Sequence, residues 1–329
     1  MVVVGVHESV TVLFPTPPST ATPYRNALQG GLTSYTMGPD PSPSRDASTA
    51  DPTVVAHENG QLAYTEYGDP DGDPVVLFHG TPGSRLLGAL FETTAEERGV
   101  RLLAVDRPGY GNSEPWPTRS ITDAGTYVSA MLDDADIETA TLLAFSGGSP
   151  QAIATAATHG GRVDRVKIVS GATPPSVSED TPTVQQVLAT LATRTPSLLG
   201  GLLRGQAWLA ERLDPEIVVS QYRADEPAEP LSDETAELIK ADFLEAILHS
   251  RRGTVTELRA NAAAWGIDFD QLSTPVELRH GGRDTNVPLA DARRFASILP
   301  DSDLTVYEDA DHLGTLLRSV PEIFEETTT

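Results

Sequence analysis

The fold of this 329-residue chain is decided by the stretch Leu142-Leu143-Ala144-Phe145-Ser146-Gly147-Gly148-Ser149-Pro150. Its apolar half predicts a strand that ends at Ser146, and Pro150 suits the first turn of a helix that begins directly afterwards. A strand that turns this sharply into a helix strains the serine backbone and needs very small residues two positions away on each side, here Ala144 and Gly148. Such a turn holds the Ser146 hydroxyl at the carboxyl edge of a sheet, beside a helix N-terminus that favours negative charge.

Short apolar runs and helical stretches alternate on both sides of this turn. The Asn59-Gly60 pair predicts a hairpin between two strands at the start of the ordered region. Further strands are predicted over 75–78, 101–105, 141–145, 166–169, 275–278 and 304–307, and helices over 86–98, 121–134, 148–159, 289–298 and 315–325. Alternation of this kind predicts an α/β fold, a mostly parallel twisted sheet of about eight strands with helices covering both faces.

The N-terminal segment differs from the rest. Residues 1–52 are rich in Pro, Ser and Thr and show no apolar periodicity. A segment of this composition buries too little apolar surface to offset the entropy lost on ordering. We therefore predict a disordered or mis-started tail, with Met37 as an alternative start that would leave residues 1–36 untranslated.

A second segment, residues 173–264, breaks the alternation of strands and helices. It contains no convincing strand, but its apolar residues recur at helical spacing, for example at Val184, Val187, Leu188 and Leu191. Either these apolar faces pack only against one another, or part of them lines a pocket. We predict a helical cap at 173–264, inserted into a core formed by the two remaining parts of the chain, 53–172 and 265–329.

Composition excludes several classes of function. The chain has 23 Lys and Arg residues against 47 Asp and Glu residues, a formal charge of −24, which argues against nucleic acids and anionic membrane surfaces as partners. Because the chain has no cysteine, disulfides, thiolate metal sites and cysteine nucleophiles are excluded. No apolar run approaches the ~18 residues that span a bilayer. We expect a cytoplasmic protein.

The basic residues have a further peculiarity. Only Lys167 and Lys240 are lysines, and all other basic residues are arginines. This acid-rich, lysine-poor composition resembles that of proteins from halophilic archaea that accumulate salt, where salt screens charges within about 3 Å at 1 M. The composition therefore predicts a protein that unfolds when molar salt is removed. An acidic cytosolic protein from an arginine-rich genome is the alternative.

The turn at Ser146 resembles the nucleophile elbow of the α/β-hydrolase superfamily, with Ala144 where that pattern prefers Gly. The superfamily supplies an acid and a base after the serine in the chain. Asp284 follows the strand at 275–278 and His312 follows the last strand, so both match those positions. The resemblance implies that Ser146 is the nucleophile, His312 its general base, and Asp284 the acid that holds the imidazole.

The residues alone leave alternatives to this triad. Asp284 is equally typical of a turn aspartate that caps its own loop. Asp309 and Asp311 flank the histidine closely enough to partner it, and His312 itself also fits an exposed loop position. What favours the triad is that three separate loops, in the expected order, each follow a strand.

Two glycine-containing loops complete the resemblance. The strand at 75–78 ends in His79-Gly80-Thr81-Pro82-Gly83-Ser84, similar to the His-Gly loop of the superfamily. An oxyanion hole needs backbone N–H donors, and we assign them to Thr81 and Gly147, since Pro82 has no N–H. We interpret His79 as a residue that orders this loop. The stretch Asp106-Arg107-Pro108-Gly109-Tyr110-Gly111-Asn112-Ser113 matches another loop of the superfamily and is interpreted as structural.

The resemblance extends over about residues 53–325. It implies a cofactor-free serine hydrolase of the esterase type, which cleaves a small-molecule carboxylic ester or related acyl compound through an acyl-enzyme. No metal-binding or nucleotide-binding motif is found in the sequence. Two alternatives stay open. One is an aminopeptidase similar to proline iminopeptidases, with Asp242 and Glu245 as cap acids, and the other is a non-catalytic small-molecule binding protein on the same fold.

Overall fold

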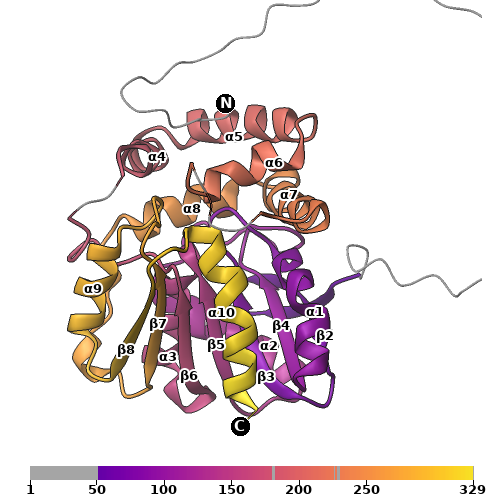
Figure 1. The fold of residues 1–329 in the computed structure, drawn as a ribbon, viewed down its shortest axis with the longest axis vertical. Coiled ribbons are helices and arrows are strands. Elements are labelled where there is room, and N and C mark those ends of the chain that lie inside the picture. Colours follow the sequence, from indigo (N-terminus) through magenta and orange to yellow (C-terminus); the bar gives the residue numbers. More distant parts are fainter. Residues whose placement is uncertain (1–50, 180–181, 226, 228–229, 329) are drawn as a thin grey trace, which may run out of the picture.

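A computed structural model describes residues 51–179, 182–225, 227 and 230–328 (Figure 1). The predicted N-terminal tail, except for its last two residues, lies outside this part of the chain. The described residues form one sheet whose strands run in the order β1-β2-β4-β3-β5-β6-β7-β8. The strands are β1 Thr53–His57, β2 Gly60–Gly68, β3 Asp73–Phe78, β4 Val100–Asp106, β5 Ala140–Phe145, β6 Val163–Val169, β7 Val276–Gly281 and β8 Ser302–Tyr307.

The pairing of these strands confirms the predicted fold class. β1 pairs antiparallel with β2, and β2 pairs antiparallel with β4, whereas every later pair in the sheet is parallel. The predicted hairpin corresponds to β1 and β2, with Gly60 at a φ of +137° at the turn. A mostly parallel sheet needs helical crossovers, which cover both of its faces.

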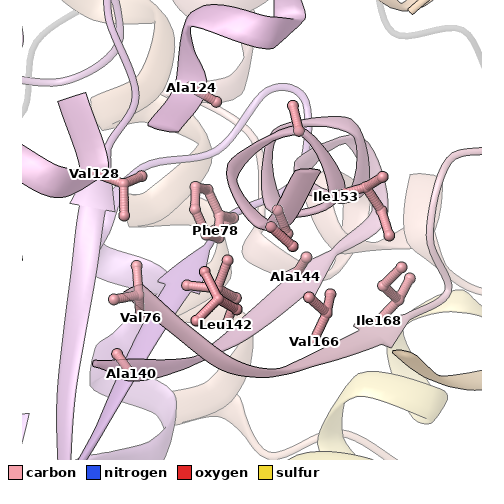
Figure 2. Close-up of a cluster of buried hydrophobic side chains, with 14 of the residues drawn as sticks. Val76, Phe78, Ala124, Val128, Ala140, Leu142, Ala144, Ile153, Val166 and Ile168 are labelled. Carbon is pink, nitrogen blue, oxygen red and sulfur yellow. The ribbon is translucent and has the colours of Figure 1, made fainter. Parts of the chain in front are cut away.

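Successive residues of the central strands contribute to opposite faces of the sheet. Val76 and Leu142 belong to the apolar core on one face (Figure 2), whereas Val75 and Leu143 belong to the core on the other. The first core is completed by α2 Ala124–Asp134, α3 Ser149–Thr158 and α9 Leu289–Ile298. The second core is completed by α1 Glu92–Glu97 and α10 His312–Thr327, the latter being yellow in Figure 1.

One predicted helix differs from the structure. The segment predicted as a helix over 86–98 begins as a 3₁₀ helix, Arg85–Phe91, and only its second half is α-helical. This first half packs closely against the sheet, since a Cβ on Gly88 would lie 2.6 Å from Cδ2 of Tyr67 and 2.8 Å from Cβ of Ala104. The close contact with β2 and β4 therefore fixes the position of this segment. The spacing of its apolar residues does not reveal that contact.

Five helices follow β6 and lie beyond the carboxyl ends of the parallel strands (Figure 1). We call them the helical layer: α4 Thr183–Arg194, α5 Pro196–Ala210, α6 Pro215–Val219, α7 Asp233–Leu248 and α8 Arg252–Asn261. Between residues 173 and 264 the described residues contain no strand. α7 buries Ile239 and Phe243 as its spacing predicts. In α4, Leu188 and Leu191 pack against a buried cluster, whereas Val184 and Val187 are 42% and 51% exposed.

None of the helices that the structure describes combines the length and the apolar character required to cross a membrane.

Candidate active site

Ser146 occupies the sharp turn that the sequence predicts. β5 ends at Phe145, and Ser146 has a φ of +51° before the chain enters a helical turn that continues into α3. A left-handed backbone is uncommon for a residue with a side chain, and such strain tends to occur at functional sites. A Cβ on Gly148 would lie 2.7 Å from the carbonyl oxygen of Phe78, so this position has no room for a side chain. Ala144, on the other side of the turn, is fully buried.

Asp284 and His312 form a direct hydrogen bond. The Nδ1 atom of His312, at the start of α10, lies 2.7 Å from Oδ2 of Asp284, in the turn after β7. The other oxygen of Asp284 accepts the backbone N–H groups of Asn286 and Val287, each at 2.9 Å. Burial favours a raised pKa for Asp284, but His312 and these hydrogen bonds outweigh burial and lower the pKa below its usual value. The ionised carboxylate only accepts, so Nδ1 donates the hydrogen bond and Nε2 remains available as a base.

Ser146 lies next to this pair. The ring of its neighbour Phe145 lies 4.9 Å from the ring of His312, at an interplanar angle of 45°. Ser146 and Leu313, the residue after the histidine, line the same pocket. A direct hydrogen bond between Ser146 and His312 is not present among the described residues, and such bonds often tighten only when substrate binds. The structure thus joins Asp284 to His312 and brings Ser146 beside them.

The other candidate partners of His312 are engaged elsewhere. Asp311 caps α10 by accepting the N–H of Gly314 at 2.7 Å, and its second oxygen faces Arg223. Asp309 is exposed and lies 3.5 Å from Arg318.

His280 is a neighbour that the sequence does not single out. Its Nε2 lies 3.5 Å from Oδ2 of Asp284 and 2.9 Å from the carbonyl oxygen of Val287. Burial lowers the pKa of His280, which keeps its ring neutral and usable as a donor to that carbonyl. The side chain thus packs behind the acid and does not compete with His312 for a proton.

The predicted oxyanion donors lie close together. A Cβ on Gly147 would lie 3.2 Å from the backbone nitrogen of Thr81 and 2.7 Å from its Cβ. Gly147 is in the first turn of a helix, where backbone N–H groups have no partner within the helix. In the part of the chain that the structure describes, the N–H of Thr81 has no recorded acceptor. Neither N–H group has an acceptor among the described residues, as the predicted role of the two groups requires.

His79 orders the loop that carries Thr81, as the sequence interpretation expects. Its Nδ1 lies 2.7 Å from the carbonyl oxygen of Gly80, and its Nε2 faces the backbone N–H of Arg107 at 3.4 Å. Burial and the neighbouring Arg107 hold the pKa of His79 well below its usual value. The neutral ring is enclosed by protein and cannot reach solvent.

A small pocket opens beside Ser146. Its lining is apolar apart from a few polar groups and consists of Gly80, Thr81, Pro82, Leu87, Phe145, Ser146, Tyr222, Ile239, Asp242 and Leu313. The pocket therefore lies where four elements, or the loops after them, meet: β3, β5, α7 and α10. A larger, charged hollow lies at the opposite edge of the sheet, around Lys167 and Glu277, and shares no residue with this pocket.

The two predicted cap acids have different positions. Asp242 lines the pocket, where its Oδ1 accepts the N–H and the hydroxyl of Ser84 at 2.7 and 2.8 Å. Burial raises the pKa of Asp242 to about 7. Glu245 instead bonds Arg85 at 2.7 Å and Asn112 at 2.9 Å, and it does not line the pocket. Only Asp242 is placed to meet a substrate.

Sequence interpretation missed one group beside the site. Glu257 of α8 and Arg107 form a fully buried ion pair, and the Glu257 carboxylate also accepts the hydroxyl of Thr81. The sequence of the loop that contains Arg107 indicates only a structural turn. No local signal marks Glu257, since it lies 150 residues from Arg107 in the chain.

Among the described residues, no group of three or more His, Asp and Glu side chains is arranged to hold a metal ion.

Comparison with known proteins agrees with this architecture. Residues 73–210 match the family described as the alpha/beta hydrolase fold. Together with the sheet topology, this match agrees with the predicted fold class, the α/β-hydrolase fold. Among curated proteins, it is 25% identical to a non-heme chloroperoxidase of Kitasatospora aureofaciens, over 79% of this chain and 92% of that protein.

One further curated protein and one solved structure are similar to this chain. A 2-hydroxy-6-oxononadienedioate/2-hydroxy-6-oxononatrienedioate hydrolase of Cupriavidus pinatubonensis is 25% identical, over 73% of this chain and 80% of that protein. Among solved structures, an esterase from Exiguobacterium antarcticum superposes with a TM-score of 0.63 at 19% identity, covering 83% of this chain and 97% of that one. The likeness to the esterase structure shows that the two chains share a fold.

Proposed function

We propose that the protein is a cofactor-free serine hydrolase that cleaves a small-molecule carboxylic ester or related acyl compound through an acyl-enzyme. The observation that carries the proposal is the 2.7 Å hydrogen bond between Asp284 and His312, beside a serine held in a left-handed turn at a pocket. A carboxylate, an imidazole and a strained serine in this order form the arrangement that activates a hydroxyl group.

In the proposed mechanism, Nε2 of His312 removes the proton of Ser146 as its oxygen attacks the acyl carbon. The N–H groups of Thr81 and Gly147 stabilise the negative oxygen of the tetrahedral intermediate. The imidazolium, stabilised by Asp284, then returns the proton to the leaving alcohol. Water activated by His312 releases the acyl group in the same way.

The helical layer serves as a cap in this proposal. Residues 53–172 and 265–329 form the catalytic core, and residues 173–264 cover it and contribute pocket residues such as Tyr222 and Ile239. These side chains set the shape of the acyl site. A cytoplasmic location is part of the same proposal, supported by the lack of cysteine, because disulfide frameworks are a feature of secreted proteins.

A fluorophosphonate probe tests the proposal, because it reacts only with an activated serine. We expect the folded wild type to be labelled and the Ser146→Ala variant to be unlabelled and inactive on p-nitrophenyl esters. Ser149→Ala is the matched control, since Ser149 lies on the adjoining turn and its buried hydroxyl has no recorded partner. An unlabelled wild type would instead support a non-catalytic binding protein.

A second function is favoured by Asp242. A carboxylate that lines the pocket beside Ser146 is suited to hold an ammonium group, as an aminopeptidase of the proline iminopeptidase type requires. Comparison of p-nitrophenyl esters with proline p-nitroanilide separates the two. Turnover of the anilide that is lost in Asp242→Asn favours the aminopeptidase, and turnover of esters alone favours the esterase.

A further inference from the structure

The carboxylate of Glu257 is the centre of a buried cluster between the helical layer and the sheet. Glu257 is fully buried in α8, and each of its oxygens accepts more than one hydrogen bond. The donors within 3 Å are Arg107 at 2.7 Å, Tyr110 at 2.8 Å, Thr81 at 2.9 Å and Arg119 at 2.9 Å. Burial alone would raise the pKa of Glu257, but the arginines outweigh it and hold that pKa at about 2.

Arg107 extends this cluster to the loop that carries the proposed oxyanion donor. Its guanidinium donates to the carbonyl oxygens of His79 and Gly80, the latter at 3.0 Å, and approaches the Thr81 hydroxyl at 3.2 Å. Three consecutive residues of the loop are thus held by one side chain. The Thr81 hydroxyl itself donates to Glu257, which joins this loop to α8.

The position of α8 relative to the cluster is closely restricted. A Cβ on Gly109 would lie 2.7 Å from the nitrogen of Gly253, so the two backbones are in direct contact. The N–H of Gly253 also donates to the carbonyl oxygen of Gly109 at 3.2 Å. Gly253 lies on α8 one turn before Glu257. This contact therefore fixes the position, along the axis of α8, at which the Glu257 carboxylate meets Thr81.

The cluster also has a charge imbalance. Arg107 and Arg119 face a single carboxylate, and the neighbouring ring of His79 is neutral. The ion pairs of this cluster therefore join two positive charges to one carboxylate. Replacing a buried ion pair by apolar side chains is often neutral or stabilising, so stability alone does not account for this arrangement.

We propose that Glu257 is a positioning residue: its hydrogen bond to the Thr81 hydroxyl fixes the backbone N–H of Thr81 on the developing oxyanion, so that docking of the helical layer completes the oxyanion hole. This inference rests on the proposed function. A single oxyanion-hole donor contributes about 10²- to 10³-fold to kcat, and the contribution depends on its placement. The helical layer would then control the rate of acyl transfer as well as the shape of the pocket.

The Thr81→Ala variant tests this inference, because it removes the hydroxyl but keeps the backbone N–H. We expect kcat for p-nitrophenyl butyrate to fall about 10-fold or more while KM changes less than about 2-fold, since the lost contact acts on the transition state. Thr81→Ser restores the hydroxyl and should recover most of the loss relative to Thr81→Ala. A purely structural role would lower the melting temperature and leave kcat in place.

A double-mutant cycle identifies Glu257 as the partner. Glu257→Gln keeps the side-chain shape but removes the charge, and we expect its effect on kcat and that of Thr81→Ala to be strongly non-additive. Tyr64→Phe is the matched control. It removes another hydroxyl-to-carboxylate hydrogen bond, 2.9 Å to Asp134, remote from the pocket, and kcat should not change.

The outcomes separate this inference from the proposed function. A wild type without esterase or amidase activity overturns both. An active wild type whose Thr81→Ala variant keeps its kcat overturns the inference alone, and so do additive effects of Thr81→Ala and Glu257→Gln. If Glu257→Gln does not fold, the comparison of Thr81→Ala with Thr81→Ser decides the matter.

Discussion

The carboxylate of Asp284 lies 2.7 Å from Nδ1 of His312, although 28 residues separate them in the chain. Asp284 follows β7 and His312 follows β8, and these strands are parallel neighbours at the end of the sheet. Because parallel neighbours end at the same edge, the loops that follow them meet there. The pairing therefore arises from the strand order, and the same edge also carries Ser146.

Replacing Asp284 by Asn tests its role in orienting the imidazole. An amide at this position offers an N–H where the ring needs an acceptor, so we expect kcat to fall by about 10²- to 10⁴-fold. Stopped-flow or steady-state ester hydrolysis measures the loss, and circular dichroism checks the fold. Asp309→Asn is the control, since Asp309 is exposed, and it should be close to wild type. A normal rate in Asp284→Asn would show that another group serves as the acid.

Replacing Gly147 by Ala tests the placement of the oxyanion donors. The added methyl would lie 2.7 Å from Cβ of Thr81, so the two donor segments must move apart. We expect kcat to fall by about 10- to 10³-fold. Gly161→Ala is the control, because no atom lies within 4 Å of a Cβ there, and its kinetics should match wild type. Equal rates for both variants would contradict the assignment of Gly147.

The charge of Asp242 predicts a pH-dependent preference between substrates. Burial raises its pKa to about 7, with nearby Asp106 adding to the shift, so the side chain is neutral below that pH and anionic above it. A p-nitrophenyl ester bearing a trimethylammonium group carries a charge that does not titrate. We expect its kcat/KM, relative to that of the tert-butyl analogue, to rise as pH increases through about 7. In Asp242→Asn this ratio should stay flat; a slope that persists there must come from another group.

The acidic, lysine-poor composition predicts a dependence of stability on salt. With a formal charge of −24, carboxylate repulsion opposes the folded state when it is unscreened. We expect the melting temperature to increase by about 10 °C or more between 0.1 and 3 M KCl. Differential scanning fluorimetry measures this shift. A melting temperature that is already high in dilute buffer and does not change with salt would contradict the halophilic interpretation.

The strands and the serine turn were predictable because their signals are local. Apolar runs bounded by turn residues marked the strands of the sheet, and Ala144 and Gly148 marked a serine between two positions that accept only small residues. The 3₁₀ start of the segment from Arg85 and the close contact of Gly88 with two strands carry no such local signal. The predicted apolar stripe of α4 packs at Leu188 and Leu191 but is exposed at Val184 and Val187, since apolar spacing does not state what covers a helix.

The partners of the candidate site were predictable only in part. Three aspartates near His312 were open candidates, and the structure distinguishes them because Asp311 caps a helix and Asp309 faces solvent. Likewise Asp242 lines the pocket and Glu245 does not, although they lie on the same helix.

The amino-acid sequence by itself therefore determined the fold class, the serine turn and the loops that carry the candidate chemistry. Backbone patterns of these kinds depend on residues that are close in the chain. The tertiary structure alone decided which acid meets His312, which acid enters the pocket, and that Glu257 of the helical layer binds Thr81 across 176 residues. Such contacts depend on how separately formed helices and loops dock, and no local pattern encodes that docking.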